Sequence, residues 1–143
     1  MPTEDVPIAE QNIYMSDLVT GVVASLGLKG REAISSDERR LSFAFEKTFE
    51  HLRQNAERYG VNPRFRVIRH YIHGTSEVVS EGILDAMQRG MLRTSVPSDG
   101  LMRLTIAVKE DPFLWIRHLP GDTQMYDELS RVFWESQHEY TNQ

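Results

Sequence analysis

The stretch that decides the fold spans residues 64–109 and reads RFRVIRHYIHGTSEVVSEGILDAMQRGMLRTSVPSDGLMRLTIAVK. Between Gly74 and Gly90, apolar residues recur at helical spacing and predict a short amphipathic helix. MLRTSV and LMRLTIAV then flank the turn sequence PSDG at 97–100, which predicts a β-hairpin. RFRVIRHYI interleaves arginines with β-branched and aromatic residues, so we expect a strand at 65–72, with a helix as the alternative.

Helices are predicted on both sides of this stretch. We expect one at 11–28 and a second that opens with a capping box, Ser35 as N-cap and Glu38 at N3, and stops at Gly60. A last helix should begin after Asp122, and 113–119 should be a further strand or a short helix. In the helix before the hairpin, the side chains expected to be buried are Val79, Ile83, Leu84 and Met87.

These elements predict one α+β domain over residues 11–143, preceded by a flexible arm at 1–10 that contains two prolines. The domain should have two N-terminal helices, a small antiparallel sheet with an intervening helix and a hairpin, and a C-terminal helix. A chain of 143 residues is long enough to bury a core of its own.

The composition of the chain excludes several kinds of metal, disulfide and membrane-spanning site. The absence of cysteine excludes disulfides and cysteine-ligated metals. His70 and His73 are three residues apart and have no evident third ligand, so we expect neither a metal nor a cofactor. No stretch is apolar over the length needed to span a bilayer, and the acidic start is unlike an export signal, so we expect a cytoplasmic protein without a membrane partner.

Charge is distributed unevenly. The net charge is −5, which argues against a general nucleic-acid binder, but residues 61–109 carry seven basic and four acidic side chains between acidic flanks. We therefore expect the middle to contact an anionic partner, with Trp115 as an aromatic anchor. The predicted contact residues are Arg64, Arg66, Arg69, Arg89, Arg93, Arg103 and Trp115. A protein is the favoured partner, nucleic acid is the second option, and a second copy of the chain is also open.

The order of a helix followed directly by a hairpin resembles the end of a winged helix. That resemblance implies a DNA-binding regulator in which Arg89, Arg93 and Arg103 contact the phosphate backbone. The face of the helix that should be exposed carries Glu77, Glu81 and Asp85, a charge that does not suit DNA.

His73-Gly74-Thr75 at an expected strand end, followed by a helix that ends at Gly90, resembles the opening motif of the ADP-ribosyltransferase and RNA 2′-phosphotransferase families. The resemblance implies an enzyme that handles NAD, in which His73 bonds the ribose and the Gly74 backbone meets the nicotinamide amide. A non-catalytic binding or adaptor module is nevertheless the favoured function, with DNA binding and NAD chemistry as the alternatives.

Overall fold

The computed structural model describes residues 11–96, 102–107 and 112–140; the expected arm at 1–10 and turn at 97–100 lie outside these ranges. The chain is α+β, as predicted. Its elements are β1 (Gln11–Ile13), α1 (Met15–Leu28), β2 (Ala33–Ser35), α2 (Glu38–Gln54), α3 (Ala56–Tyr59), β3 (Val61–Pro63), α4 (Glu77–Gln88), β4 (Leu92–Ser95), β5 (Arg103–Ile106), α5 (Pro112–Ile116) and α6 (Thr123–Glu139).

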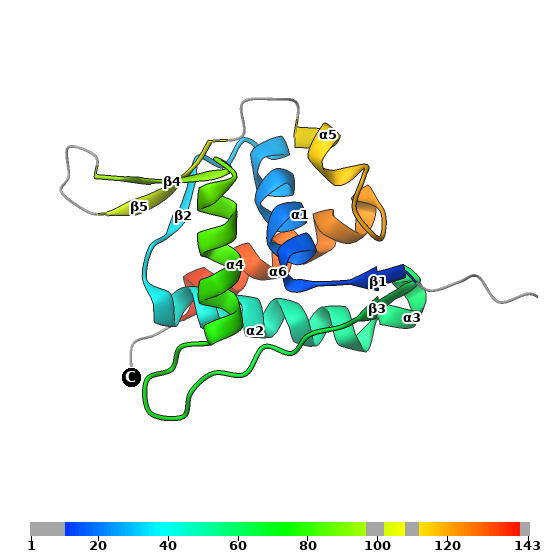
Figure 1. Ribbon diagram of the computed structural model, residues 1–143, viewed down its shortest axis with the longest axis horizontal. Helices are drawn as coiled ribbons and strands as arrows, with labels where there is room; N and C mark the ends of the chain where they lie inside the picture. Colours follow the sequence, from blue (N-terminus) through cyan, green and yellow to red (C-terminus); the bar gives the residue numbers. More distant parts are fainter. Residues whose placement is uncertain (1–10, 97–101, 108–111, 141–143) are drawn as a thin grey trace, which may run out of the picture.

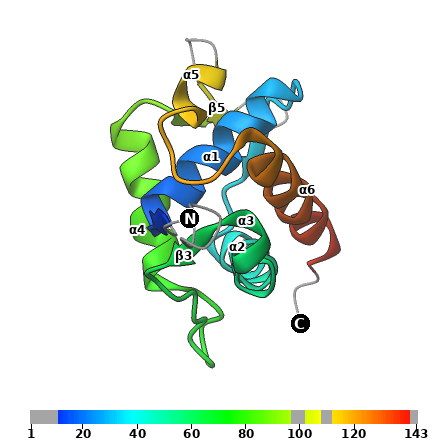
Figure 2. The same ribbon diagram turned by 90° about the vertical axis from the view of Figure 1, so that its right-hand side faces the viewer.

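The core lies between the helices. α1 and α2 both pack on α6, while α4 and α5 pack on α1 (Figures 1 and 2). The rings of Phe45 on α2 and Phe133 on α6 lie 4.6 Å apart, and both are fully buried. Tyr126 is also fully buried against Gly21, where a Cβ would lie 2.1 Å from the tyrosine ring. Glycine inside α1 therefore allows α6 to approach closely.

Two small sheets flank this core. β2, β5 and β4 form an antiparallel sheet in that order, with β5 in the centre. The predicted hairpin is therefore confirmed in its two strands, and β2 adds a third strand that we had not predicted. β1 and β3 pair in parallel at the other side of α4 (Figure 1).

The helix before the hairpin is confirmed as α4. The Ser76 hydroxyl caps it by accepting a hydrogen bond from the Val79 amide, and Gly90 leaves it with a φ of 80°. β4 begins two residues later, which gives the winged-helix-like order of helix and hairpin. One expected core residue is wrong: Leu84 is 54% exposed, because the hairpin diverges from α4 instead of covering it.

The helix boundaries differ from the prediction where a strand competes. Residues 11–13 pair with β3, so α1 begins only at Met15. Ser35 pairs with Arg103 in the sheet, so Asp37, not Ser35, is the N-cap of α2. The single helix predicted up to Gly60 is interrupted at Asn55, between α2 and α3. Its predicted stop at Gly60 is confirmed, since this residue ends α3 with a φ of 70°.

The strand expected at 65–72 is wrong, and so is the helical alternative: after β3 the chain has no regular structure until α4. The Arg64 amide donates to the Ile13 carbonyl at 2.9 Å, which is the last backbone bond of the β1–β3 pair. Beyond Ile13 the chain turns into α1. No strand of this sheet therefore remains beside residues 65–72. For 113–119 the alternative of a short helix is confirmed, since α5 spans Pro112–Ile116 and no strand forms there.

Candidate docking surface

The segment 64–76 forms a loop that leaves β3, runs past α2 and projects from the body before it enters α4 (Figure 1). Its flanks are anchored on α2. On the incoming side, the Phe65 ring lies 5.2 Å from the Phe49 ring, and Val67 is buried. On the outgoing side, the Ser76 amide donates to the Ser42 hydroxyl at 2.9 Å. The body therefore holds the loop at both ends.

The tip of the loop is ordered by its own hydrogen bonds. The His70 amide donates to the Thr75 carbonyl and the Gly74 amide donates to the His70 carbonyl, both at 2.7 Å. Gly74 has a φ of 70°, a conformation that suits glycine. His70 Nδ1 accepts from the amides of Ile72 at 3.2 Å and His73 at 3.3 Å. The turn is therefore a defined structure.

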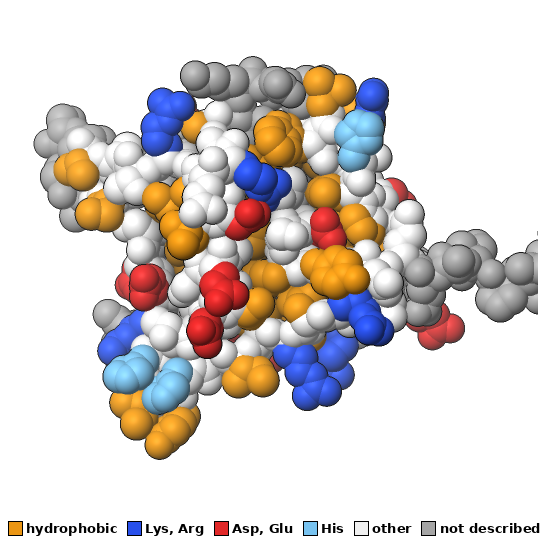
Figure 3. Space-filling model, in the orientation of Figure 1, with side chains coloured by type: hydrophobic (Ala, Val, Ile, Leu, Met, Phe, Trp, Pro, Cys, Tyr) orange, Lys and Arg blue, Asp and Glu red, His pale blue; other side chains and the backbone are white. Residues whose placement is uncertain are grey.

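Three large apolar side chains of this loop face solvent. Tyr71 is 91% exposed, Ile68 69% and Ile72 63%. We call these three residues the apolar tip. Hydrophobic side chains gather beside two histidines at the lower left of Figure 3, where the loop projects. Sequence analysis missed this feature because it assigned the three residues to a strand. A signal was present in Gly74, which ends a run of bulky residues with a turn.

The predicted contact residues fall into separate places. Arg64 and Arg66 are exposed on the loop and make no ion pair within the described part of the chain. Arg69 is already engaged: its Nε and Nη2 both lie 3.0 Å from Glu46 Oε1 on α2, and its guanidinium lies over the Phe43 ring. That pair helps to hold the loop.

The remaining predicted residues lie away from the loop. Arg89 is engaged with Asp85 at 2.9 Å and with the Thr20 hydroxyl at 2.5 Å, and its guanidinium lies 5.9 Å from the Trp115 ring. Trp115 itself is partly buried against the core on α5. Arg93 and Arg103 are exposed on the hairpin. The predicted contact residues are therefore spread over the loop, the end of α4, α5 and the hairpin. Figure 3 shows Lys and Arg side chains in separate patches on this face.

A second apolar feature is a groove of about 370 Å³ between α4, the start of α2 and the hairpin. Leu84 and Met87 line its α4 side, and Met102 and Leu104 line its hairpin side. Leu84 and Met102 are 54% and 57% exposed. Glu38 adds a carboxylate where α2 begins.

Two shallower hollows adjoin the loop. One is lined by Arg66 and Ile68 from the loop and by Glu77 and Glu81 from α4. The other contains His73 with Thr75, and its remaining lining comes from Asp37, Glu38 and Arg39. His73 therefore lies on an exposed turn, not at the end of a strand, and carboxylates face it.

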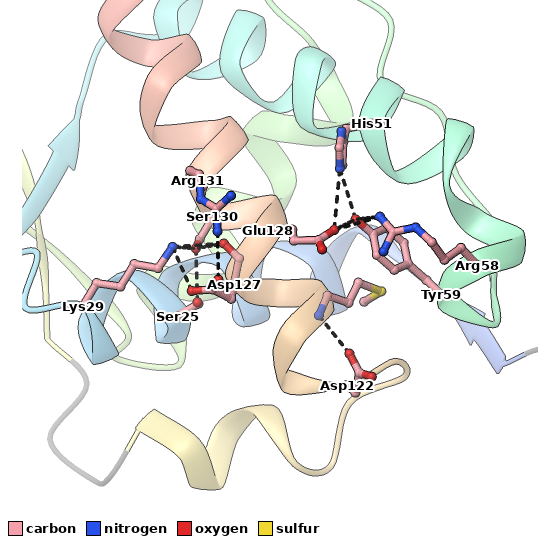
Figure 4. A network of polar contacts seen from close by, with 11 residues as sticks. Ser25, Lys29, His51, Arg58, Tyr59, Asp122, Asp127, Glu128, Ser130 and Arg131 are labelled. Carbon is pink, nitrogen blue, oxygen red and sulfur yellow. Dashed lines mark hydrogen bonds and ion pairs between the residues drawn. The ribbon is translucent and has the colours of Figure 1, made fainter.

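A polar network joins α2, α3 and α6 on another side (Figure 4). Glu128 accepts hydrogen bonds from Arg58, at 2.9 Å, and from the Tyr59 hydroxyl, which lies 3.1 Å from His51 Nε2. The bonds from Arg58 and Tyr59 lower the pKa of Glu128 from 4.5 to about 2. Burial and the bond to Glu128 raise the pKa of Tyr59 to about 12. The groups satisfy one another, which suits a role in holding the helices together.

The described part of the chain contains no group of three or more His, Asp or Glu side chains placed to hold a metal ion. Within residues 11–96, 102–107 and 112–140, none of the helices has the length and apolar character to cross a membrane. Comparison of the chain with protein-family models, with curated proteins and with solved structures finds no match in any of the three.

Proposed function

We propose that this protein is a non-catalytic protein-binding module whose contact element is the loop 64–76. The observation that carries the proposal is the apolar tip: Ile68, Tyr71 and Ile72 face solvent on a turn closed by its own hydrogen bonds. Scattered single exposed apolar residues are ordinary, but three on one projecting turn are typical of a contact surface.

Energetics support a docking role for an ordered loop. Burying apolar surface contributes about 25 cal/mol per Å², and aromatic anchors such as Tyr71 dominate many interfaces. The tip needs little further ordering on binding, because the bonds around His70 already define its shape. Pre-organisation of this kind leaves more of the contact energy for affinity.

Charge around the tip favours an anionic protein as the partner. Arg64 and Arg66 lie on the same loop and can meet carboxylates at the rim of a partner's apolar pocket. Glu77 and Glu81 line the hollow beside Arg66 and Ile68, and an anionic lipid surface would repel both carboxylates. A protein rim of mixed charge accommodates both signs.

The two alternatives have less support. For DNA binding, α4 would have to approach phosphates with Glu77, Glu81 and Asp85 on it, and Arg89 is already bonded to Asp85 and Thr20. For NAD chemistry, the pyrophosphate would approach His73 in a hollow where two carboxylates, Asp37 and Glu38, outnumber the one arginine, Arg39.

A photo-crosslinker at the tip tests the proposal. With p-benzoylphenylalanine in place of Tyr71, irradiation in the native host should yield a covalent adduct with a protein, and Ile72→Ser in the same chain should reduce its yield. The matched control carries the crosslinker in place of Tyr14, which is exposed at the start of α1. Adducts with nucleic acid or lipid, equal yields from both positions, or no adduct from position 71 would contradict the proposal.

A further inference from the structure

The groove beside α4 has the properties that the apolar tip requires of its partner. Leu84 on its α4 side and Met102 on its hairpin side are both more than half exposed. Its volume of about 370 Å³ lies at the small end of the range for ligand pockets, roughly 300–1,000 Å³, so it suits a few side chains and not a whole element.

The border of the groove is negative. Glu38 lines the groove where α2 begins. Glu77 and Glu81 lie on the next stripe of α4, between the groove and the hollow that they share with Arg66 of the same copy. On the hairpin, Thr94, Met102 and Leu104 line the groove. Side chains alternate along a strand, so Arg93 and Arg103 belong to the opposite face.

Tip and groove are therefore complementary in two respects. The tip is apolar with Arg66 beside Ile68, and the groove is apolar with the Glu38 carboxylate in its lining. The loop leads directly into α4 and the groove runs along α4, so both lie on the same side of the molecule (Figure 1).

We propose that the protein associates with a second copy of itself, with the apolar tip of each copy seated in the groove of the other. The inference rests on the proposed function, in which the loop is the contact element, and it names the partner. A two-fold axis makes the contact reciprocal and closed, so both exposed apolar features of each copy are covered at once. An occupant from another protein, such as a basic amphipathic helix, would cover the groove and leave the tip exposed.

The contact is small, since each half involves one turn and one short groove. Interfaces that bury less than about 1,200 Å² in total are typical of weak, transient complexes. We therefore expect a dimer that dissociates on dilution and weakens as salt screens the arginines and carboxylates.

Sedimentation velocity of the full chain over a range of concentrations tests this inference. The wild type should show a monomer–dimer equilibrium. Tyr71→Ala removes the anchor, and Leu84→Lys places a cation in the groove that receives Arg66. Each substitution acts in both halves of a two-fold dimer, so each should raise the dissociation constant at least about tenfold. The matched controls are Tyr14→Ala and Leu28→Lys, at exposed positions at the start and end of α1, which should leave the equilibrium unchanged.

Sedimentation of an equimolar mixture of the two variants tests whether each tip binds the groove of the other copy. Tyr71→Ala retains an intact groove and Leu84→Lys retains an intact tip, so an equimolar mixture should form a heterodimer through one intact contact, more tightly than either variant associates alone. A wild type that is monomeric throughout, a dimer insensitive to either substitution, or a mixture that stays monomeric would overturn the inference. If the wild type is monomeric while position 71 still crosslinks to another protein, the proposed function stands and only the second copy is wrong.

Discussion

The α2–α6 contact and the projecting loop use the same kinds of side chain in opposite ways. In the contact, Tyr59, Arg58 and His51 converge on Glu128 (Figure 4). On the loop, Tyr71 has its ring stacked 5.2 Å from His70 but faces solvent, and Arg66 has no ion pair within the described residues.

Under the proposed function, the difference separates the residues that stabilise the fold from those that contact a partner. Side chains of the contact satisfy one another, and the packed pair Phe45 and Phe133 joins the same two helices, α2 and α6. The Arg69–Glu46 ion pair and the Ser76–Ser42 hydrogen bond hold the loop on α2, while the side chains of Tyr71 and Ile72 remain exposed. A partner can bind the tip without competing with the core.

The largest expected loss of stability follows from removing a buried side chain from the α2–α6 contact. Phe45→Ala leaves a cavity opposite Phe133, and deletion of a buried phenylalanine costs about 3–5 kcal/mol of unfolding free energy. Urea denaturation measures the loss. Leu28→Ala, at the exposed end of α1, is the control and should change stability by no more than about 0.5 kcal/mol. Equal losses in the two variants would contradict the assignment of the core.

An intermediate effect is expected from the polar network, and its pH dependence is specific. Because folding lowers the pKa of Glu128 from 4.5 to about 2, its carboxylate stabilises the fold fully above pH 4.5 and loses this effect as the pH falls toward 2. Glu128→Gln should therefore be less stable than the wild type near neutral pH, and the difference should shrink below pH 4.5.

Urea midpoints measured in acidic steps give this difference directly. Glu135→Gln, at an exposed position of the same helix, is the matched control and should show no such pH dependence. A difference between Glu128→Gln and wild type that stays constant down to low pH would show that charge is not the source of the stabilisation.

The smallest expected effect on stability belongs to the tip. Tyr71→Ala removes a side chain that is 91% exposed, so the unfolding free energy should change by no more than about 0.5 kcal/mol. Urea denaturation and sedimentation on the same sample would then separate a stable fold from a lost contact. A loss of unfolding free energy close to that of Phe45→Ala would show that Tyr71 stabilises the fold, which would contradict the contrast between tip and core.

Local signals in the sequence predicted the helices well. Asp122 caps α6 as expected, its carboxylate accepting from the Met125 amide at 2.8 Å, and Gly60 and Gly90 end their helices with positive φ. These features depend on neighbours within one or two turns. Helix caps and stops can therefore be predicted without knowledge of the rest of the fold.

The loop and the groove were not predictable in the same way. Residues 65–72 have the composition of a strand, but β1 ends at Ile13 and offers them no partner. Leu84 fits the apolar stripe of α4, but it stays exposed because the hairpin diverges from the helix. In both cases a distant segment decides whether an apolar residue is covered.

By itself, the sequence determined that this chain is an α+β protein, that helices end at Gly60 and Gly90, that a last helix follows Asp122, and that a hairpin follows α4. Only the tertiary structure decided that the basic middle is divided, with Arg69 and Arg89 engaged inside the molecule and Arg64 and Arg66 left on a projecting loop. The physical reason is the sequence separation over which each kind of interaction acts. Caps and turns are set by adjacent residues, whereas pairing and burial depend on which remote surfaces meet.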